Sequence, residues 1–296
     1  MTARAVLYAP SGTLRVWWRV AGFLLVFFAA DQAVSAVAHR LPVPASFTGQ
    51  LTIAFGSVLA AAALATWVML RRVDDRAWST AFLGKEAARP RLLGAGLALG
   101  AFGILLPSGL LVAAGWMRVA PAQTAAVSGA GPALFALQAA VLFLPQSLAE
   151  ELLSRGYAFN AIREAAGPAA AIAVSSLVFG ALHLGNPGAD FRSFANVVVA
   201  GVWLGAIVVV TRSVYAAWMA HFAWNFAIAG VLHAPLSGIP FPTPAYALTA
   251  DGPAWATGGR WGPEGSAFAA LSMLAMTALL ARRATGGAPR LEAAHG

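Results

Sequence analysis

Long apolar runs separated by short polar segments dominate the sequence. A helix needs about 20 mostly apolar residues to cross the hydrocarbon core of a bilayer. Eight stretches reach or approach this length: Val20–Ala38, Leu51–Leu70, Leu92–Met117, Ala133 through the mid-150s, Pro168–Leu184, Phe194–Thr211, Ser213–Leu232 and Ser266–Ala281. The pattern predicts an all-α polytopic membrane protein, a single transmembrane domain over residues 1–296 with a bundle of about eight transmembrane helices.

The composition supports a membrane protein. Apolar residues make up 59% of the 296 positions and charged residues 10%, whereas an ordinary soluble domain is about 25% charged. Such a chain cannot cover a water-facing surface with charge, so a soluble enzyme is excluded. The absence of cysteine excludes disulfides, cysteine-ligated zinc and a cysteine nucleophile.

The formal charge of +8 is explained by where the basic residues lie. Lys and Arg are enriched in the cytoplasmic loops of membrane proteins. With eight spans and both termini in the cytoplasm, all basic residues except Arg40, Arg118, Arg192 and Arg260 fall on the inner side. This predicts a multi-pass protein of the cell inner membrane with cytoplasmic N- and C-termini. The charge therefore marks topology, and no nucleic-acid partner is expected.

Few ionisable residues lie inside the apolar spans, and each is costly enough there to mark a candidate functional position. The polar groups of interest are Asp31, Glu150 and Glu151 with Arg155, His183, and His221 with Asn225. Glu151 and Arg155 are four residues apart, so a helix places them on one face as a neutralising pair. Glu150 points about 100° away, has no partner expected in its own helix, and is free to face a cavity. Asp31 has no assigned role.

Two histidines can reach the level of Glu150. An antiparallel hairpin at the Gly167-Pro168 turn brings His183 level with it. His221 and Asn225 are four residues apart and project together from one helix. Each feature also has a plainer interpretation: an acidic helix end near water, a core histidine and an interhelical hydrogen bond.

A carboxylate, two imidazoles and a carboxamide in a poorly solvated cavity suit the hydrolysis of an acyl bond. Glu150 can act as general base on a water molecule, and His183 can orient that water. His221 and Asn225 can donate hydrogen bonds to a developing oxyanion, usually the largest contribution in acyl transfer. A serine mechanism has less support because the sequence has no G-x-S-x-G motif, and H-E-x-x-H is absent as well.

Three short motifs occur in order on successive apolar helices. Glu150-Glu151-Leu-Leu-Ser-Arg155 fits E-E-x-x-x-R, Phe179-Gly-Ala-Leu-His183 fits F-x-x-x-H, and His221-Phe-Ala-Trp-Asn225 fits H-x-x-x-N/D. On these motifs the chain resembles the CAAX protease and bacteriocin-processing family (CPBP/ABI) of intramembrane endopeptidases, related to the eukaryotic CAAX prenyl endopeptidase. The resemblance covers about residues 133–232, the expected catalytic core. Residues 233–265 are interpreted as an outer Pro/Gly-rich loop.

The resemblance implies a hydrolase with its active site inside the helix bundle. Its substrate would be a membrane-associated peptide or protein, and the enzyme would bind that substrate in the lipid bilayer. Glu150 would activate water with His183 as its partner. His221 and Asn225 would stabilise the oxyanion, while Glu151, Arg155 and Phe179 would support the site.

The cofactor and the functional class leave alternatives open. Members of the family have been described as metalloproteases and as glutamate-dependent peptidases, and zinc is one option, held by Glu150, His183 and His221 with an open fourth position. Asn225 is a poor zinc ligand and no carboxylate is evident behind either histidine, so no cofactor is favoured. The same groups would also serve a proton-coupled transporter or a non-enzymatic membrane immunity or scaffold protein. The missing inverted repeat argues against a transporter.

Overall fold

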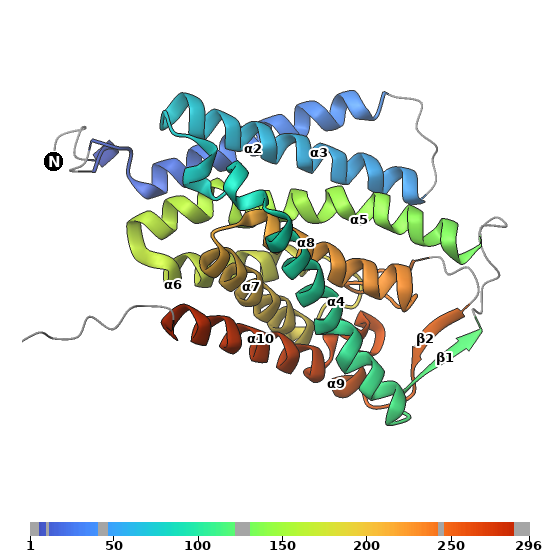
Figure 1. Cartoon of the computed structure of the whole chain (residues 1–296). Helices are drawn as coiled ribbons and strands as arrows, with labels where there is room; N and C mark the ends of the chain where they lie inside the picture. The colour runs from blue at the N-terminus through green and yellow to red at the C-terminus, as the bar shows by residue number, and fades with distance from the viewer. Residues whose placement is uncertain (1–5, 10–11, 41–46, 122–130, 242–245, 287–296) are drawn as a thin grey trace, which may run out of the picture.

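The computed structural model describes residues 6–9, 12–40, 47–121, 131–241 and 246–286. Within these ranges the chain forms a bundle of helices with one small sheet at its edge (Figure 1). The main helices are α2 (Val16–Ala38), α3 (Phe47–Val68), α4 (Pro90–Ala113), α5 (Pro132–Arg155), α6 (Tyr157–Leu182), α7 (Phe191–Thr211), α8 (Val214–Phe226) and α10 (Ala267–Gly286). Each predicted span overlaps one of them, so the all-α class is confirmed.

Five helical stretches of the described chain are long and apolar enough to cross a membrane: Val16–Ala38, Gly49–Val73, Pro90–Ala113, Ala133–Leu182 and Phe191–Thr211. The fourth stretch contains both α5 and α6. Large apolar side chains such as Phe102, Val141 and Leu271 are exposed on the outside of the bundle. Large exposed apolar surface is unfavourable in water, whereas lipid tolerates it. The long apolar helices and these exposed side chains together indicate a multi-pass membrane protein.

Short elements connect the long helices. The π-helical turn η1 (Met69–Val73) and the 3-10 turns η2 (Trp78–Ala81) and η3 (Lys85–Ala88) link α3 to α4, and η4 (Ala227–Val231) extends α8. Strands β1 (Met117–Pro121) and β2 (Tyr246–Ala250) pair antiparallel, with Met117 opposite Ala250. The turns α9 (Ala254–Thr257), η5 (Gly259–Trp261) and η6 (Pro263–Gly265) precede α10.

One expected helix end differs from the structure. The span expected over Leu92–Met117 ends as a helix at Ala113, because the chain turns there and Met117 enters β1. The described residues of segment 233–265, which was expected as a Pro/Gly-rich loop, contain the short elements β2, α9, η5 and η6. Residues 242–245 of that segment lie outside the described residues.

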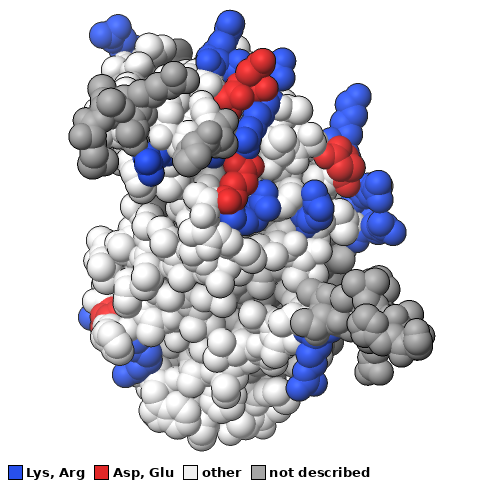
Figure 2. Space-filling view, turned by 90° about the vertical axis from the view of Figure 1, so that its left-hand side faces the viewer, with Lys and Arg blue, Asp and Glu red and all other residues white. Residues whose placement is uncertain are grey.

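The start of α2 and the end of α10 lie on the same side of the bundle (Figure 1). Figure 2 shows this end of the molecule, where Lys and Arg side chains gather with Asp and Glu at the level of α2 and α3. Arg19 of α2 contributes a buried ion pair at 2.6 Å to Asp74, which follows η1. The Arg19 guanidinium also donates to Tyr157 and Glu164 of α6. This network ties the first span to the helix that begins after α5.

Two glycines interrupt the path from α5 through α6. Gly156 separates the two helices with a non-helical ψ of −125°, so α5 ends in the mid-150s, as expected. Gly167 has a φ of 85°, a left-handed conformation that residues with a Cβ rarely adopt. The chain reverses there, and the hairpin predicted at Gly167-Pro168 is confirmed.

Small residues let α4 and α8 approach closely. A Cβ at Gly96 would lie 2.3 Å from the carbonyl oxygen of Ala216, and one at Gly100 would lie 2.0 Å from that of Ala220. Helix pairs in membranes use glycines four residues apart for such backbone contact. The contact fixes the position of α8, the helix that carries His221 and Asn225.

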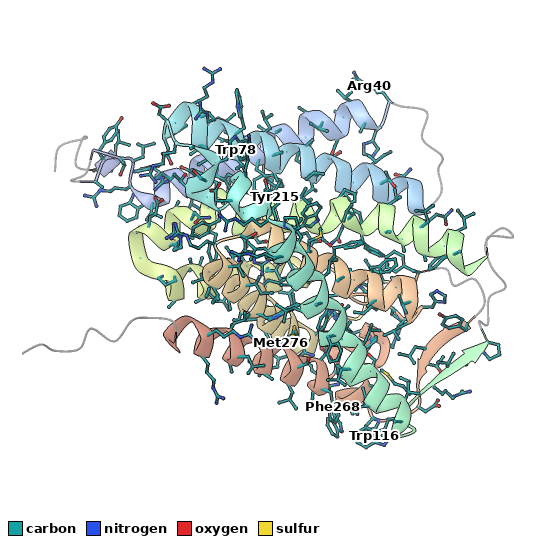
Figure 3. The ribbon with its side chains drawn as sticks, in the orientation of Figure 1. Arg40, Trp78, Trp116, Tyr215, Phe268 and Met276 are labelled. Carbon is teal, nitrogen blue, oxygen red and sulfur yellow. The ribbon has the colours of Figure 1, made fainter. Side chains whose placement is uncertain are left out.

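An aromatic cluster closes the end of the bundle near the sheet. Trp116 packs edge-on against Trp255 and Phe268, with ring centroids 5.9 and 6.3 Å away. Figure 3 shows Trp116 and Phe268 together where α4 and α10 meet. The cluster anchors the segment before α10, which forms one wall of the cavity described next.

Candidate active site

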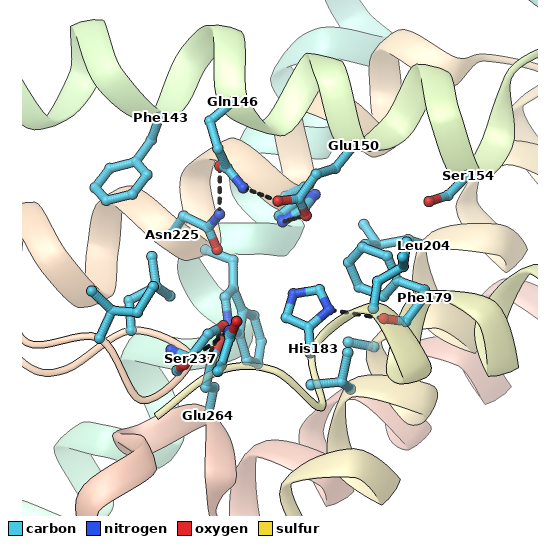
Figure 4. A pocket seen from close by; sticks show the side chains of 18 of the residues that line it. Phe143, Gln146, Glu150, Ser154, Phe179, His183, Leu204, Asn225, Ser237 and Glu264 are labelled. Carbon is cyan, nitrogen blue, oxygen red and sulfur yellow. Dashed lines mark hydrogen bonds and ion pairs between the residues drawn. The ribbon is translucent and has the colours of Figure 1, made fainter. Parts of the chain in front are cut away.

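A cavity of about 230 Å³ lies between α5, α6, α7, α8 and the segment that follows α8. Glu150, His183, His221 and Asn225 all line it, so the structure brings together the four residues that the sequence selected for chemistry. Figure 4 shows Glu150 on one wall, with Asn225 and His183 projecting toward the same space. Their roles in catalysis stay a prediction.

Glu151 and Arg155 lie directly behind the cavity and are fully buried. The Arg155 Nη1 atom donates to Glu151 Oε1 at 3.1 Å, as the spacing of four residues predicts, and Nη2 donates to the carbonyl oxygen of Gly201 on α7. A buried charge needs a partner because its desolvation is costly. The pair therefore neutralises itself while joining α5 to α7.

The same oxygen of Glu151 holds His221. His221 Nδ1 lies 2.9 Å from Glu151 Oε1, and a carboxylate can only accept, so Nδ1 carries the proton. Nε2 of His221 lies 3.7 Å from Glu150 Oε2 and faces the cavity side. The expectation that no carboxylate lies behind either histidine is thus wrong for His221, because Glu151 turns toward α8 as well as toward Arg155.

The Phe179 ring joins these polar groups from α6. The Arg155 guanidinium lies over it at 4.4 Å, and the imidazoles of His183 and His221 pack against it at 4.7 and 5.9 Å. An aromatic face attracts a desolvated cation. Phe179 therefore packs between the buried ion pair and both imidazoles.

His183 caps the end of α6, and its tautomer follows from its neighbour. Its Nδ1 donates to the carbonyl oxygen of Phe179 at 2.8 Å, so in the neutral ring Nε2 bears the lone pair. His183 is half-buried and lines the cavity. Nε2 is the atom available to accept a hydrogen bond from water or substrate.

Glu150 has a partner in its own helix, contrary to expectation. Gln146, one turn earlier on α5, donates from Nε2 to Glu150 Oε1. The other oxygen, Oε2, is buried and has no hydrogen-bond partner in the described chain. The indole Nε1 of Trp203, which also lines the cavity, is likewise unpaired. Buried polar atoms without partners need an explanation, and a cavity that receives water or substrate provides one.

The cavity is also lined by polar residues that the three motifs do not contain, among them Gln146 and Glu264. Gln146 accepts at its Oε1 from Asn225 Nδ2 at 3.0 Å, and its signal was a neutral amide inside an apolar span. Glu264, in η6, accepts from the Ser237 hydroxyl at 2.7 Å and from Trp224 Nε1 at 3.2 Å. No sequence spacing connects Glu264 to the motifs, because the folding of segment 233–265 brings it there.

The donor atoms around the cavity do not form a metal-ligand set. No group of three or more His, Cys, Asp or Glu side chains in the part of the chain that the structure describes is arranged to hold a metal ion. One oxygen of Glu150 is engaged by Gln146, and Nδ1 of His221 faces Glu151. These contacts leave Glu150 Oε2 and Nε2 of His221 toward the cavity, and a carboxylate behind a histidine is also found at metal sites, so they do not decide between the metal-free site and the zinc alternative.

The fold and the cavity define a polytopic membrane protein with carboxylate, imidazole and carboxamide groups facing one cavity. Residues 132–227, which run from α5 to the start of η4, match the family model described as type II CAAX prenyl endopeptidase Rce1-like. Over this stretch, which is about a third of the chain, the protein is similar to the CAAX protease family, a family of membrane proteases. No curated protein matches the chain closely enough to count as a relative.

Proposed function

We propose that the protein is a membrane-embedded endopeptidase that hydrolyses a peptide bond with a water activated by Glu150 and His183. The observation that carries the proposal is the convergence of Glu150, His183, His221 and Asn225 on one cavity inside a bundle of apolar helices. Hydrolysis in such a place needs a fixed base and fixed donors, because bulk solvent does not stabilise the charge that develops.

The attack uses the free oxygen of Glu150. Oε2 takes a proton from water as the water oxygen bonds to the carbonyl carbon of the scissile peptide, and His183 Nε2 accepts the second hydrogen of that water as a hydrogen bond. General-base catalysis of this kind is worth about a hundredfold to ten-thousandfold in rate. When the C–N bond breaks, the protonated Glu150 returns its proton to the leaving amine.

The carbonyl oxygen becomes an oxyanion in the intermediate, and α8 supplies its donors. Asn225 Nδ2 has two hydrogens, of which Gln146 takes one. His221 donates from Nε2 when both ring nitrogens carry a proton, with Nδ1 directed to Glu151. Both donors come from one rigid helix, so little reorganisation is needed during the reaction.

The substrate proposed is a membrane-associated peptide or protein that reaches the cavity from the lipid bilayer. Much of the cavity wall is apolar, including Phe143, Leu236 and Phe241, which suits an extended segment that is itself buried in lipid. No metal and no nucleic acid takes part in the proposal. Glu151, Arg155 and Phe179 act as supports for the groups that touch substrate.

The experiment is cleavage of a library of lipid-anchored, quenched fluorescent peptides by the purified protein in liposomes. The parent protein is expected to cleave a subset of the library, and Glu150→Gln is expected to be inactive with an unchanged melting temperature. Glu86→Gln is the matched control, because Glu86 is an exposed acid in η3 away from the cavity. Cleavage by Glu150→Gln at the parent rate, or no cleavage by the parent, would reject the proposal.

We also propose that the protein lies in the cell inner membrane with both termini in the cytoplasm. The chain has no cysteine, so single cysteines at the exposed positions Ser79 and Ala250 report their side without background. In intact cells an impermeant maleimide should label Ala250→Cys and should label Ser79→Cys only after permeabilisation. The reverse result would invert the orientation.

A further inference from the structure

Gln146 occupies a central place in the cavity although none of the three motifs contains it. It lies one helical turn before Glu150 on α5, so both side chains project from one face, and it is 6% exposed. Figure 4 shows its amide between Asn225 and Glu150, in contact with both. It therefore joins the proposed base on α5 to the proposed oxyanion donor on α8.

The hydrogen bonds of Gln146 have a fixed direction. Its Nε2 donates to Glu150 Oε1, while its Oε1 accepts from Asn225 Nδ2 at 3.0 Å and from the Ser147 hydroxyl at 3.1 Å. An ionised carboxylate can only accept, whereas an amide has a donor and an acceptor end. The anionic Glu150 thus orients Gln146, and the Gln146 carbonyl in turn orients the amide of Asn225.

This chain of bonds selects the reactive atoms at both ends. Holding Oε1 of Glu150 leaves Oε2 as the unpaired oxygen, 3.7 Å from His221 Nε2. Holding one hydrogen of Asn225 Nδ2 leaves the second for another acceptor, and within the described chain no further acceptor contacts that amide. If Gln146 were turned over, its oxygen would face a carboxylate and Asn225 would present its own oxygen instead.

We propose that Gln146 is a positioning residue. It sets the direction of the Asn225 amide, and it determines which oxygen of Glu150 is free to take the proton from water. The inference rests on the proposed endopeptidase function. Gln146 then affects the rate of the chemical step. A residue that only formed a hydrogen bond between two helices would affect stability alone.

The test measures kcat and KM in liposomes with the library peptide that the parent cleaves fastest. Gln146→Met keeps the size of the side chain but can neither donate to Glu150 nor accept from Asn225. We expect kcat to fall by about tenfold to a hundredfold, the scale of a small misplacement of reacting groups, with KM changed less than about threefold. Gln138→Met is the matched control, because Gln138 is the same residue type exposed on the same helix, and it should retain the parent kcat.

A double-mutant cycle separates positioning from support of the fold. If Gln146 acts through Asn225, then Gln146→Met in an Asn225→Ala background should lower kcat by much less than it does in the parent. A parent-like kcat in Gln146→Met overturns the inference, and an equal loss in both backgrounds overturns the part of it that acts through Asn225. If Gln146→Met does not fold, Gln146→Asn keeps an amide that is too short to reach both partners, and the same cycle and criteria apply.

Failure of this inference is distinguishable from failure of the proposed function. Glu150→Gln is assayed on the same peptide in the same liposomes. An inactive Glu150→Gln with a fully active Gln146→Met rejects the positioning role and leaves the endopeptidase intact. An active Glu150→Gln rejects the endopeptidase mechanism itself.

Discussion

Glu151 Oε1 accepts from His221 Nδ1 at 2.9 Å while it also accepts from Arg155 at 3.1 Å, so one carboxylate oxygen links α5 to α8. The two adjacent glutamates consequently differ in environment: Glu151 is fully buried behind the cavity, and Glu150 lines it. An imidazole held at Nδ1 by a carboxylate presents Nε2 in a defined orientation.

Replacing Glu151 is therefore expected to damage both folding and catalysis. In Glu151→Gln the neutral amide cannot compensate the buried Arg155 guanidinium, and breaking a buried pair on one side costs about 3–5 kcal/mol in free energy of unfolding. The melting temperature in detergent should fall accordingly. Peptide cleavage by the fraction that remains folded should fall as well, because a neutral amide oxygen holds the His221 imidazole more weakly than the carboxylate does.

A double replacement separates these two effects. In Glu151→Leu with Arg155→Met no buried charge is left, and such exchanges are often neutral for stability. We expect the melting temperature to recover toward the parent value while cleavage stays low. A double variant that cleaves like the parent would contradict an orienting role for Glu151.

Metal removal gives a second prediction. Protein purified without added metal is expected to keep its cleavage rate in excess chelator and to contain substoichiometric zinc. The physical reason is that the proposed mechanism assigns the activation of water to Glu150 and His183, and in the described chain no group of three or more His, Asp or Glu side chains is already arranged as a ligand set. Activity that is lost in chelator and restored by zinc would show that the site rearranges around a metal.

The main features of the site could be predicted from local spacing. Glu151 and Arg155, like His221 and Asn225, are four residues apart, and helix geometry alone puts each pair on one face. The turn at Gly167-Pro168 made it possible to predict that His183 lies level with Glu150, because the rise per residue of a helix converts the number of residues from the turn into a distance along the helix axis. These inferences hold because each depends on a single helix or a single hairpin.

The remaining features depend on contacts between distant segments. The approach of Glu264 to Ser237 and Trp224 requires segment 233–265 to fold against α8, and no periodicity of the sequence encodes that contact. The hydrogen bond from Gln146 to Asn225 joins α5 to α8. A neutral amide in an apolar helix is a weaker signal than a charge, although interhelical amide bonds are common in membrane bundles.

A third prediction concerns the cap of α7, outside the membrane span. The Ser193 backbone N–H donates to Asp190 at 2.7 Å, and chiefly this bond holds the pKa of Asp190 below its ordinary value. A carboxyl with a depressed pKa in the folded state stabilises the fold above its unfolded pKa, and this contribution is lost as pH falls through the folded pKa. Asp190→Ala should cost about 1 kcal/mol at pH 7.

The pH dependence of that cost identifies its origin. The difference in melting temperature between the parent and Asp190→Ala should narrow as the pH is lowered below the ordinary range of an aspartate. Asp190→Asn keeps a capping oxygen without the charge. Its melting temperature should therefore lie near that of the parent, without the contribution to stability that the parent loses in acid. A difference that is constant from neutral to acid pH would exclude a contribution from the carboxylate charge.

The last prediction concerns the contact that positions α8. Gly100→Ala places a Cβ 2.0 Å from the backbone oxygen of Ala220, and backbone cannot yield as a flexible side chain does. We expect a loss of about 1–3 kcal/mol in free energy of unfolding and a lower kcat, because α8 must shift while it carries His221. Gly94→Ala on the same helix has open space around the new methyl group and should be neutral or stabilising, since alanine favours helix. Equal melting temperatures for the two alanine variants would show that α4 and α8 do not rely on this close approach.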